Sequence, residues 1–459
     1  MELSIGRRQL AGPALAAAKR LWIPAILLLV FAEGAGAQEA AISAADTSWM
    51  LISTALVLLM TPALAFFYGG LVNTKNMLNT MMMSFVALGV IGVLWALVGY
   101  SLAFAPGSGF VGSTANALLR GVGSEPNGTI PHMLFMAYQA TFAIITAALI
   151  SGALIGRMRF GAYVVFIALW GLLVYSPIAH WVWQSGGWLF TRGALDFAGG
   201  TVVHVNAGAA ALVAAMVLGG RAEYGKRAFL PHNVPFVLLG AGLLWFGWFG
   251  FNGGSALASN EIAALAFTNT LLAPTATLLV WALLDHLRTG KITAVGGATG
   301  IVVGLVAITP AAGFISPMSA LLLGGIAAFP SYFAIQWRSR TRLDDSLDVF
   351  AAHGVGGATG ALLTGVFASA VANPITGMDG LLRGNPGIMI VQATAVLASF
   401  AYSGAMTFIL LKLIGLVMPL RGSARDEGVG MDILNHGEEA YLHGDGAVLL
   451  LDEEINGSR

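Results

Sequence analysis

The sequence contains no cysteine and few charged residues, and each of these shortages excludes a class of protein. Without cysteine there is no disulfide framework, thiolate metal site or cysteine nucleophile. Only 10% of the 459 residues are charged, whereas a soluble domain carries about 25%. The 22 acidic and 22 basic residues cancel, so no strong attraction to nucleic acid is implied. Since 57% of the residues are hydrophobic, these charges are too few to form the surface of a soluble protein.

Long apolar runs and many glycines take the place of the missing charge. Runs without Asp, Glu, Lys or Arg include residues 81–104, 133–156 and 349–372. Each is longer than the ~20 residues that a helix needs to cross a bilayer. Small residues let membrane helices pack closely, which suits a chain with 60 glycines. We therefore predict an all-α polytopic membrane protein.

Eleven apolar segments after residue 38 qualify as transmembrane helices. They lie near residues 48–71, 81–104, 131–156, 160–180, 197–219, 231–253, 262–284, 293–310, 313–336, 349–372 and 390–417, and the eighth is short and Gly-rich. With the mature N-terminus outside, eleven Lys and Arg fall in cytoplasmic loops and only Arg120, Arg192 and Arg383 in external ones. This distribution predicts an external N-terminus and a cytoplasmic C-terminus in the inner (plasma) membrane.

The first 37 residues have the pattern of a cleaved signal peptide. Four basic residues precede the apolar run 21–32, which is too short to span, and Ala35-Gly36-Ala37 then forms a small-x-small cleavage pattern. The alternative is an uncleaved first helix. We expect residues 1–37 to be removed, residues 38–420 to form the membrane domain, and residues 421–459 to form a cytoplasmic tail.

Two pairs of similar short segments indicate a five-plus-five inverted repeat, because the members of each pair lie five spans apart. Phe67-Tyr68-Gly69-Gly70 in the first span resembles Phe251-Asn252-Gly253-Gly254 in the sixth. His204 in the fifth span and His353 in the tenth are each followed by a glycine four residues later. Because five is an odd number of spans, the two halves cross the membrane in opposite orientations. This pattern is common in transporters whose pathway lies between the halves.

His204 and His353 are the two of the eight histidines that lie inside apolar runs. A polar ring at membrane depth is unfavourable without a partner, so it marks a pathway; the alternative is a structural histidine bonded to a carbonyl. If a pseudo-two-fold axis relates the repeats, the two rings meet near the midplane. Two imidazoles alone make a poor metal site, and nothing beside them favours hydrolysis, so we expect no metal, cofactor or enzymatic activity. A neutral imidazole pair instead suits a small polar solute or a proton relay.

Four long segments resemble the ammonium transporter family (Amt/Mep/Rh), and specifically its bacterial Amt branch. They are residues 57–70, 196–208, 248–255 and 348–354, in the family's order and spread over nearly the whole mature chain. The resemblance implies a homotrimer in which each subunit has its own pore for ammonium or its analogue methylammonium, used in nitrogen uptake.

The resemblance implies roles for residues of an external ammonium site. Trp183 and Ser255 match the residues that hold the ion before entry, through an indole face and a hydroxyl oxygen. Without the resemblance, Trp183 reads as an interfacial belt residue. Tyr138 stands where many bacterial members carry Phe, which keeps the aromatic face and adds a hydroxyl. Asp196 matches an acidic residue behind the site or, compatibly, a helix N-cap, and Asn252 is a supporting residue.

Further roles that the resemblance implies concern the mouth and the pore. Phe142 and Phe251 match two stacked rings that close the external mouth, although sequence alone reads them as core packing. His204 and His353 match the twin histidines of a narrow pore. Ammonium would be recruited outside, lose a proton near the gate and pass as ammonia, with or without the proton following.

The cytoplasmic side carries two further sets of residues. Asp344, Asp345 and Asp348 precede the tenth span, where capping and salt bridges with Arg338, Arg340 or Arg342 are expected. The tail resembles a motif that couples subunits and responds to a P-II-type regulator, through Gly430, Asp432, His436, Gly437, Glu438 and Tyr441.

Two alternatives for the function stay open. One is an Rh-like neutral gas channel, against which Trp183 and the tail motif argue. The other is an ammonium sensor, which usually carries a signalling domain larger than a tail of about 40 residues.

Overall fold

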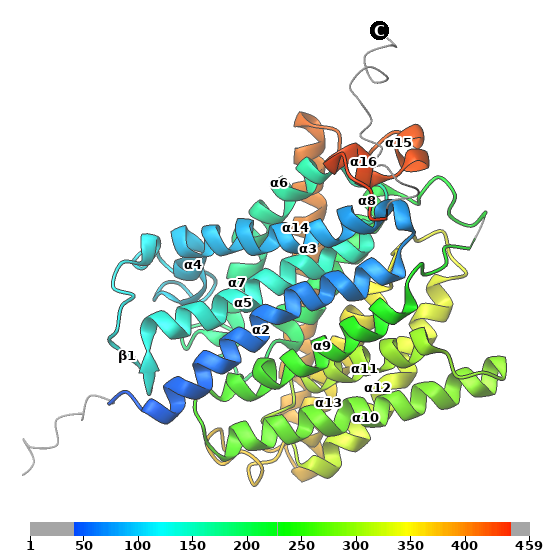
Figure 1. The fold of residues 1–459 in the computed structure, drawn as a ribbon. Coiled ribbons are helices and arrows are strands. Elements are labelled where there is room, and N and C mark those ends of the chain that lie inside the picture. The colour runs from blue at the N-terminus through cyan, green and yellow to red at the C-terminus, as the bar shows by residue number, and fades with distance from the viewer. Residues whose placement is uncertain (1–40, 227, 442–459) are drawn as a thin grey trace, which may run out of the picture.

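The computed structural model describes residues 41–226 and 228–441, and most of them are helical (Figure 1). The expected signal peptide and the chain beyond Tyr441 lie outside the described residues. Within the described ranges, ten helical segments are long and apolar enough to cross a membrane. Their apolar composition and length support a multi-pass membrane protein.

Several of these ten segments join an α-helix to a wider π-helical turn. In chain order they are α2 (Ala44–Leu71); α3, η2 and α4 (Met77–Leu94, Trp95–Gly99 and Tyr100–Phe104); α5 (His132–Ile150); α6, η5 and α7 (Phe160–Trp170, Gly171–Tyr175 and Ser176–Trp183); η6 and α8 (Gly200–Val205 and Asn206–Leu218); α9 (Val234–Gly253); α10 (Glu261–Thr289); α12 (Pro317–Arg338); η8 and α13 (Phe350–Val355 and Gly356–Phe367); and α14 (Gly387–Val417).

The remaining elements are short. Helix α11 (Ala294–Ile308) coincides with the expected eighth span but has only 15 residues. The shorter elements are a hairpin of β1 (Pro126–Asn127) and β2 (Ile130–Pro131), the tail helices α15 (Ala424–Val429) and α16 (Met431–His436), and single 3₁₀ turns at 74–76, 117–119, 151–153, 254–256 and 381–383. About ten spans are therefore present, and the count of eleven and the inverted repeat remain predictions.

Helix starts follow the usual capping chemistry at the ends of the bundle. The side chain of Ser43 accepts from Asp46 N–H at the start of α2, and Asn260 accepts from the N–H groups of Ile262 and Ala263 at the start of α10. Figure 1 places the β-hairpin and the tail helices at opposite ends of the bundle.

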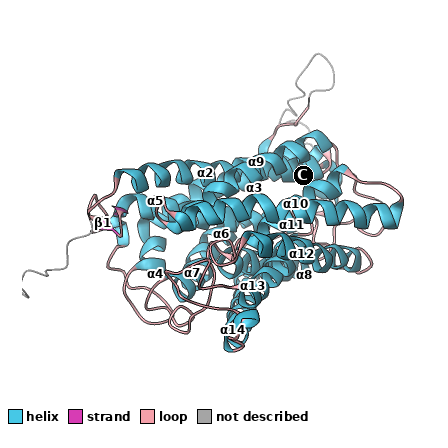
Figure 2. Ribbon diagram, turned by 90° about the horizontal axis from the view of Figure 1, so that it is seen from below, coloured by secondary structure: helices cyan, strands magenta, loops and turns pink. Residues whose placement is uncertain are grey.

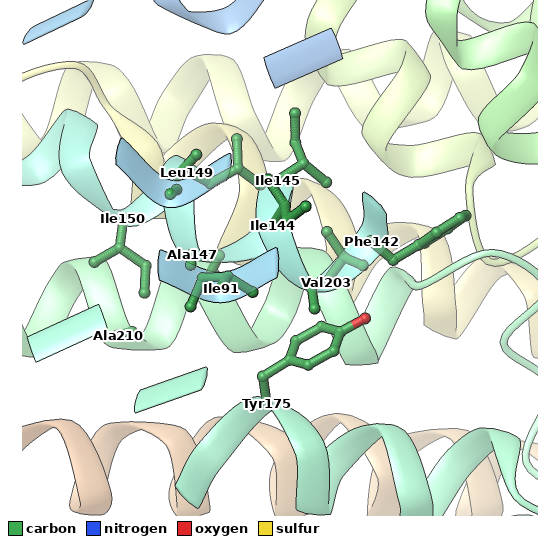
Figure 3. Close-up of a cluster of buried hydrophobic side chains, with 14 of the residues drawn as sticks. Ile91, Phe142, Ile144, Ile145, Ala147, Leu149, Ile150, Tyr175, Val203 and Ala210 are labelled. Carbon is green, nitrogen blue, oxygen red and sulfur yellow. The ribbon is translucent and has the colours of Figure 1, made fainter. Parts of the chain in front are cut away.

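The interior of the bundle consists of buried side chains, and its outer surface carries exposed apolar side chains. Helix α2 packs along α9 and α5, while α10 packs against α11 and α12. Figure 3 shows part of the interior, where Phe142 and Val203 lie among aliphatic side chains such as Ile144, Ile145 and Leu149. Large apolar side chains such as Leu279, Phe333 and Leu416 remain exposed, as expected for helices that face lipid. Figure 2 shows the loops around α4 and α7 gathered at one end of the helices.

Candidate functional site

A cavity of about 450 Å³ opens at the end of the bundle that carries the β-hairpin. Three of the residues expected at the mouth, Trp183, Ser255 and Phe142, line it. The other lining residues are Tyr100, Phe104, Pro106, Asn116, Asn127, His132, Phe135, Gln139, Gln184, Ser185, Phe197 and Leu257. We refer to this cavity as the vestibule.

Trp183 and Ser255 present complementary chemistry to the vestibule. The indole Nε1–H of Trp183 donates to the backbone oxygen of Asp196 at 2.9 Å, which fixes the ring. The hydroxyl of Ser255 donates to the backbone oxygen of Phe251 at 2.8 Å. Because its proton is used there, the Ser255 oxygen has lone pairs left to accept hydrogen bonds from a ligand. A π-face and an acceptor oxygen are the groups that a small cation with N–H donors requires.

Tyr138 lies behind the vestibule with no exposed surface. Its hydroxyl is 2.9 Å from the backbone oxygens of both Gly250 and Phe251 and 3.3 Å from Ser255 Oγ. Its ring meets Phe142 edge to face at 5.0 Å. Tyr138 is therefore in contact with the residues of the expected external site and gate.

Phe142 lies at the floor of the vestibule and stacks on Phe251. Their rings stack with centroids 4.2 Å apart and planes 28° apart, and both side chains are buried. Phe142 comes from α5 and Phe251 from the last turn of α9. The expected stacked arrangement of these two rings is present, and their role as a gate remains a prediction.

His204 and His353 meet below this floor. Their Nδ1 atoms are 3.2 Å apart, and the His204 ring lies 6.2 Å from the ring of Phe251. Together with apolar residues such as Leu64 and Trp248, they line a small cavity of about 10 Å³ whose lining side chains are buried. A hydrogen bond between the two Nδ1 atoms requires one of them to donate and the other to accept. The Nε2 atom of His204 is buried and has no hydrogen-bond partner among the described residues.

The two histidines belong to the two π-helical turns η6 and η8, and two glycines let these segments cross closely. A Cβ on Gly208 would come within 2.3 Å of the Gly354 backbone, and one on Gly357 within 2.8 Å of His204 Cβ. Each glycine follows its own histidine by four residues and touches the other segment. The similarity between the His204 and His353 segments therefore corresponds to one reciprocal contact, and π turns commonly mark functional positions.

Asp196 caps the helical segment that carries His204. Its Oδ1 accepts from the N–H groups of Gly199 and Gly200, and its Oδ2 from those of Thr201 and Val202 and from the Thr201 hydroxyl. Gly199 occupies the N-cap position itself, so Asp196 satisfies the free N–H groups of this segment from three residues upstream. Because Asp196 also holds Trp183 through its backbone oxygen, it joins the vestibule wall to the histidine segment. The side-chain amide of Asn252, the expected supporting residue, donates to Thr270 Oγ1 at 2.9 Å.

Three aspartates, Asp344, Asp345 and Asp348, lie just before η8, the segment that carries His353. Asp348 pairs with Arg338 at 2.6 Å as expected, and Asp345 accepts from Phe350 N–H at 2.7 Å as a cap. Asp344 does not pair with Arg338, Arg340 or Arg342; it binds Arg221 at 2.8 Å and Arg157 at 3.6 Å. No local pattern indicated these partners, because more than a hundred residues separate them from Asp344.

Two of these buried carboxyl groups have pKa values shifted in opposite directions. It acts to raise the pKa of Asp344, but the Arg221 and Arg157 guanidiniums outweigh it and hold that pKa below its usual value. Burial raises the pKa of Asp345 to about 7, and the nearby Asp348 carboxylate adds to the rise. Asp345 Oδ1 is buried without a hydrogen-bond partner among the described residues, consistent with this rise.

The tail packs against the end of the bundle remote from the vestibule. Asp432 accepts from the N–H groups of Leu78 and Asn79 at 3.0 and 2.8 Å at the start of α3. His436 lies 3.3 Å from Asn79 Oδ1. The other expected tail residues are Gly430 and Gly437, both with positive φ, Tyr441, whose hydroxyl contacts His232 and Asn233 at 3.3 Å, and Glu438, which is exposed.

Comparison with known proteins gives this geometry a family. The profile of the Ammonium Transporter Family matches residues 48–441. An ammonium transporter of Bacillus subtilis (strain 168) is 46% identical over 86% of this chain and 98% of its own length. One of Aquifex aeolicus (strain VF5) is 47% identical over 91% of this chain and 98% of its own length.

Solved structures agree with this assignment. The crystal structure of Saccharomyces cerevisiae Mep2 matches with a TM-score of 0.78 and 36% identity, over 84% of this chain and 92% of that one. A protein described as a sensor Amt protein matches with a TM-score of 0.79 and 27% identity, over 85% of this chain and 98% of that one. Because its profile match and its curated relatives extend over most of its length, the chain belongs to the ammonium transporter family.

Proposed function

We propose that this ammonium transporter recruits the ammonium ion in the vestibule between Trp183 and Ser255. The indole face attracts the charge, and the Ser255 oxygen accepts one N–H. Tyr138 forms the back of this site, and Asp196 fixes Trp183 from behind. The supporting observation is the orientation of the Ser255 hydroxyl, whose proton is already donated to a backbone oxygen.

Selectivity against potassium follows from what lies below the vestibule. Moving either ion intact into the apolar cavity at the histidines would cost many kcal/mol. Ammonium can release a proton and continue as ammonia, whereas potassium has no proton to release. We infer that deprotonation occurs at the Phe142–Phe251 gate and that ammonia passes His204 and His353. The observation that carries this proposal is the small apolar cavity lined by two imidazoles and by Phe251, one of the two stacked rings.

The wider organisation of the protein is proposed on the family resemblance and the loop charges. The vestibule faces outside and the tail faces the cytoplasm of the inner membrane, as the loop lysines and arginines predict. Three subunits assemble, each with its own pore and with eleven spans arranged as an inverted repeat. The tail binds a P-II-type regulator, which a nucleotide-dependent pull-down would test.

Uptake of labelled methylammonium into proteoliposomes tests the proposed transport. We expect saturable uptake that excess potassium does not compete away, and an alanine at Ser255 or a leucine at Trp183 should raise KM. Uptake that follows only the gradient of the neutral amine, with or without a membrane potential, would support an Rh-like gas channel instead. Binding without uptake would support a sensor and contradict the proposal.

A further inference from the structure

One hydroxyl group bridges the two helices that carry the gate rings. Tyr138 lies on α5, and its hydroxyl is 2.9 Å from the backbone oxygens of Gly250 and Phe251 in the last turn of α9. Both oxygens are closer to it than Ser255 Oγ, at 3.3 Å. The hydroxyl therefore contacts the end of α9 from the opposite helix.

Counting protons shows what the hydroxyl of Tyr138 is bonded to. Ser255 has its shortest contact, 2.8 Å, with the Phe251 oxygen and donates its proton there. The single proton of Tyr138 is then shared between the Gly250 and Phe251 oxygens. Since the Tyr138 side chain has no exposed surface, these oxygens and not the vestibule take up its polar end.

This bridge is placed where it can control the gate. Phe142 follows Tyr138 by one helical turn on α5, and Phe251 is one of the two residues whose backbone oxygen the hydroxyl contacts. The ring of Tyr138 also packs on Phe142 at 5.0 Å. The stacked pair and the bridge therefore join the same two stretches of backbone.

We propose that the Tyr138 hydroxyl is a clamp that limits how far α5 and α9 separate when the gate opens. Tyr138 is then a positioning residue that makes the gate selective for ammonium over bulkier alkylammonium ions. The inference rests on the proposed role of Phe142 and Phe251 as the gate. It differs from a role of the Tyr138 ring face as a surface for the ion.

The phenylalanine variant isolates the clamp, because Tyr138→Phe removes one oxygen and leaves the ring. Loss of one such hydrogen bond corresponds to about fivefold in an opening equilibrium, taking ~1 kcal/mol for the bond. We expect the ratio of methylammonium uptake to ammonium uptake in proteoliposomes to rise by up to about this factor. Tyr163→Phe is the matched control, since Tyr163 is equally buried but its hydroxyl lies 3.5 Å from the Ala147 oxygen, away from the gate.

The outcomes separate failure of the clamp from failure of the proposed transport. An unchanged ratio in Tyr138→Phe, with ammonium uptake intact, would overturn the clamp and leave the transport proposal standing. A wild-type protein that takes up neither amine would instead refute the transport proposal.

Amide hydrogen exchange gives a readout that does not depend on transport. The clamp predicts faster exchange of residues 250–257 in Tyr138→Phe than in the wild type or Tyr163→Phe. Equal exchange rates at that segment in all three proteins would refute it even if the variant were inactive.

Discussion

Replacing Asp196 by alanine removes the acceptor for four backbone N–H groups and one hydroxyl at the start of the His204 segment. A hydrogen bond to a charged group contributes about 1.5–3 kcal/mol, so five such bonds sum to about 7–15 kcal/mol, and we take about 7 kcal/mol as the limit because bonds to one shared acceptor do not add fully. Water can replace only some of the lost hydrogen bonds, because Asp196 is 7% exposed. Even half of the limit would be a severe loss for a single substitution. Since the cap positions His204 and the Asp196 backbone oxygen holds Trp183, transport should fall as well.

Thermal unfolding in detergent and methylammonium uptake would measure both effects. Asp196→Asn keeps one carbonyl oxygen and should be intermediate in both assays. Asn260→Ala is the matched control, because it removes the cap of α10, which has two N–H partners and lies outside the pathway. It should cost ~1 kcal/mol and leave uptake unchanged. The reasoning is refuted if Asp196→Ala unfolds no earlier than Asn260→Ala and transports at the wild-type rate.

Three further predictions follow from the histidine pair, the buried carboxyl and the tail. His204→Ala should reduce ammonium currents in proteoliposomes if the pair relays a proton; an undiminished, still selective current would exclude the relay. Burial raises the pKa of Asp345 from 3.8 to about 7, so the folded protein binds a proton that the unfolded chain releases. The free energy of unfolding should therefore fall as the pH rises from about 4 to about 7. Asp345→Asn should raise the unfolding temperature at about pH 8 but not at about pH 4, and equal shifts at the two pH values would contradict the raised pKa. Asp432→Ala removes two hydrogen bonds to α3 and should speed amide exchange across 424–436; unchanged exchange would mean that other contacts hold the tail.

Hydropathy was sufficient to predict most of the spans, because a bilayer imposes a minimum apolar length. The contact between the histidines was also expected from the sequence, because the predicted inverted repeat would place equivalent positions on opposite sides of one axis. The start of the second span differs from its prediction. The apolar run begins near residue 81, whereas α3 begins at Met77. Lys75 just before it donates to the Glu427 and Gly428 oxygens of the tail, a contact that no local pattern reveals.

Three other features had no local signal in the sequence. A π turn differs from an α turn by one residue, and the spacing of apolar residues does not resolve this difference when the whole segment is apolar. The partners of Asp344 are set by packing between distant loops. The position of the Tyr138 hydroxyl likewise depends on how α5 meets the end of α9, and the resemblance to the family indicated only an aromatic ring there.

The contact between the two Nδ1 atoms has a consequence for any proton that follows ammonia. One proton fits between these atoms, so at any moment one Nδ1 carries it and the other does not. Passing a proton along the pair exchanges the tautomers of both rings, and a second proton cannot follow in the same direction until they have returned. Both side chains are buried, at 1% and 3% exposure, which leaves little room for the rings to turn over. Each proton transfer would therefore leave the two rings in tautomers that cannot pass another proton in the same direction. The return of both rings to their first tautomers would then limit the turnover of a proton-coupled cycle.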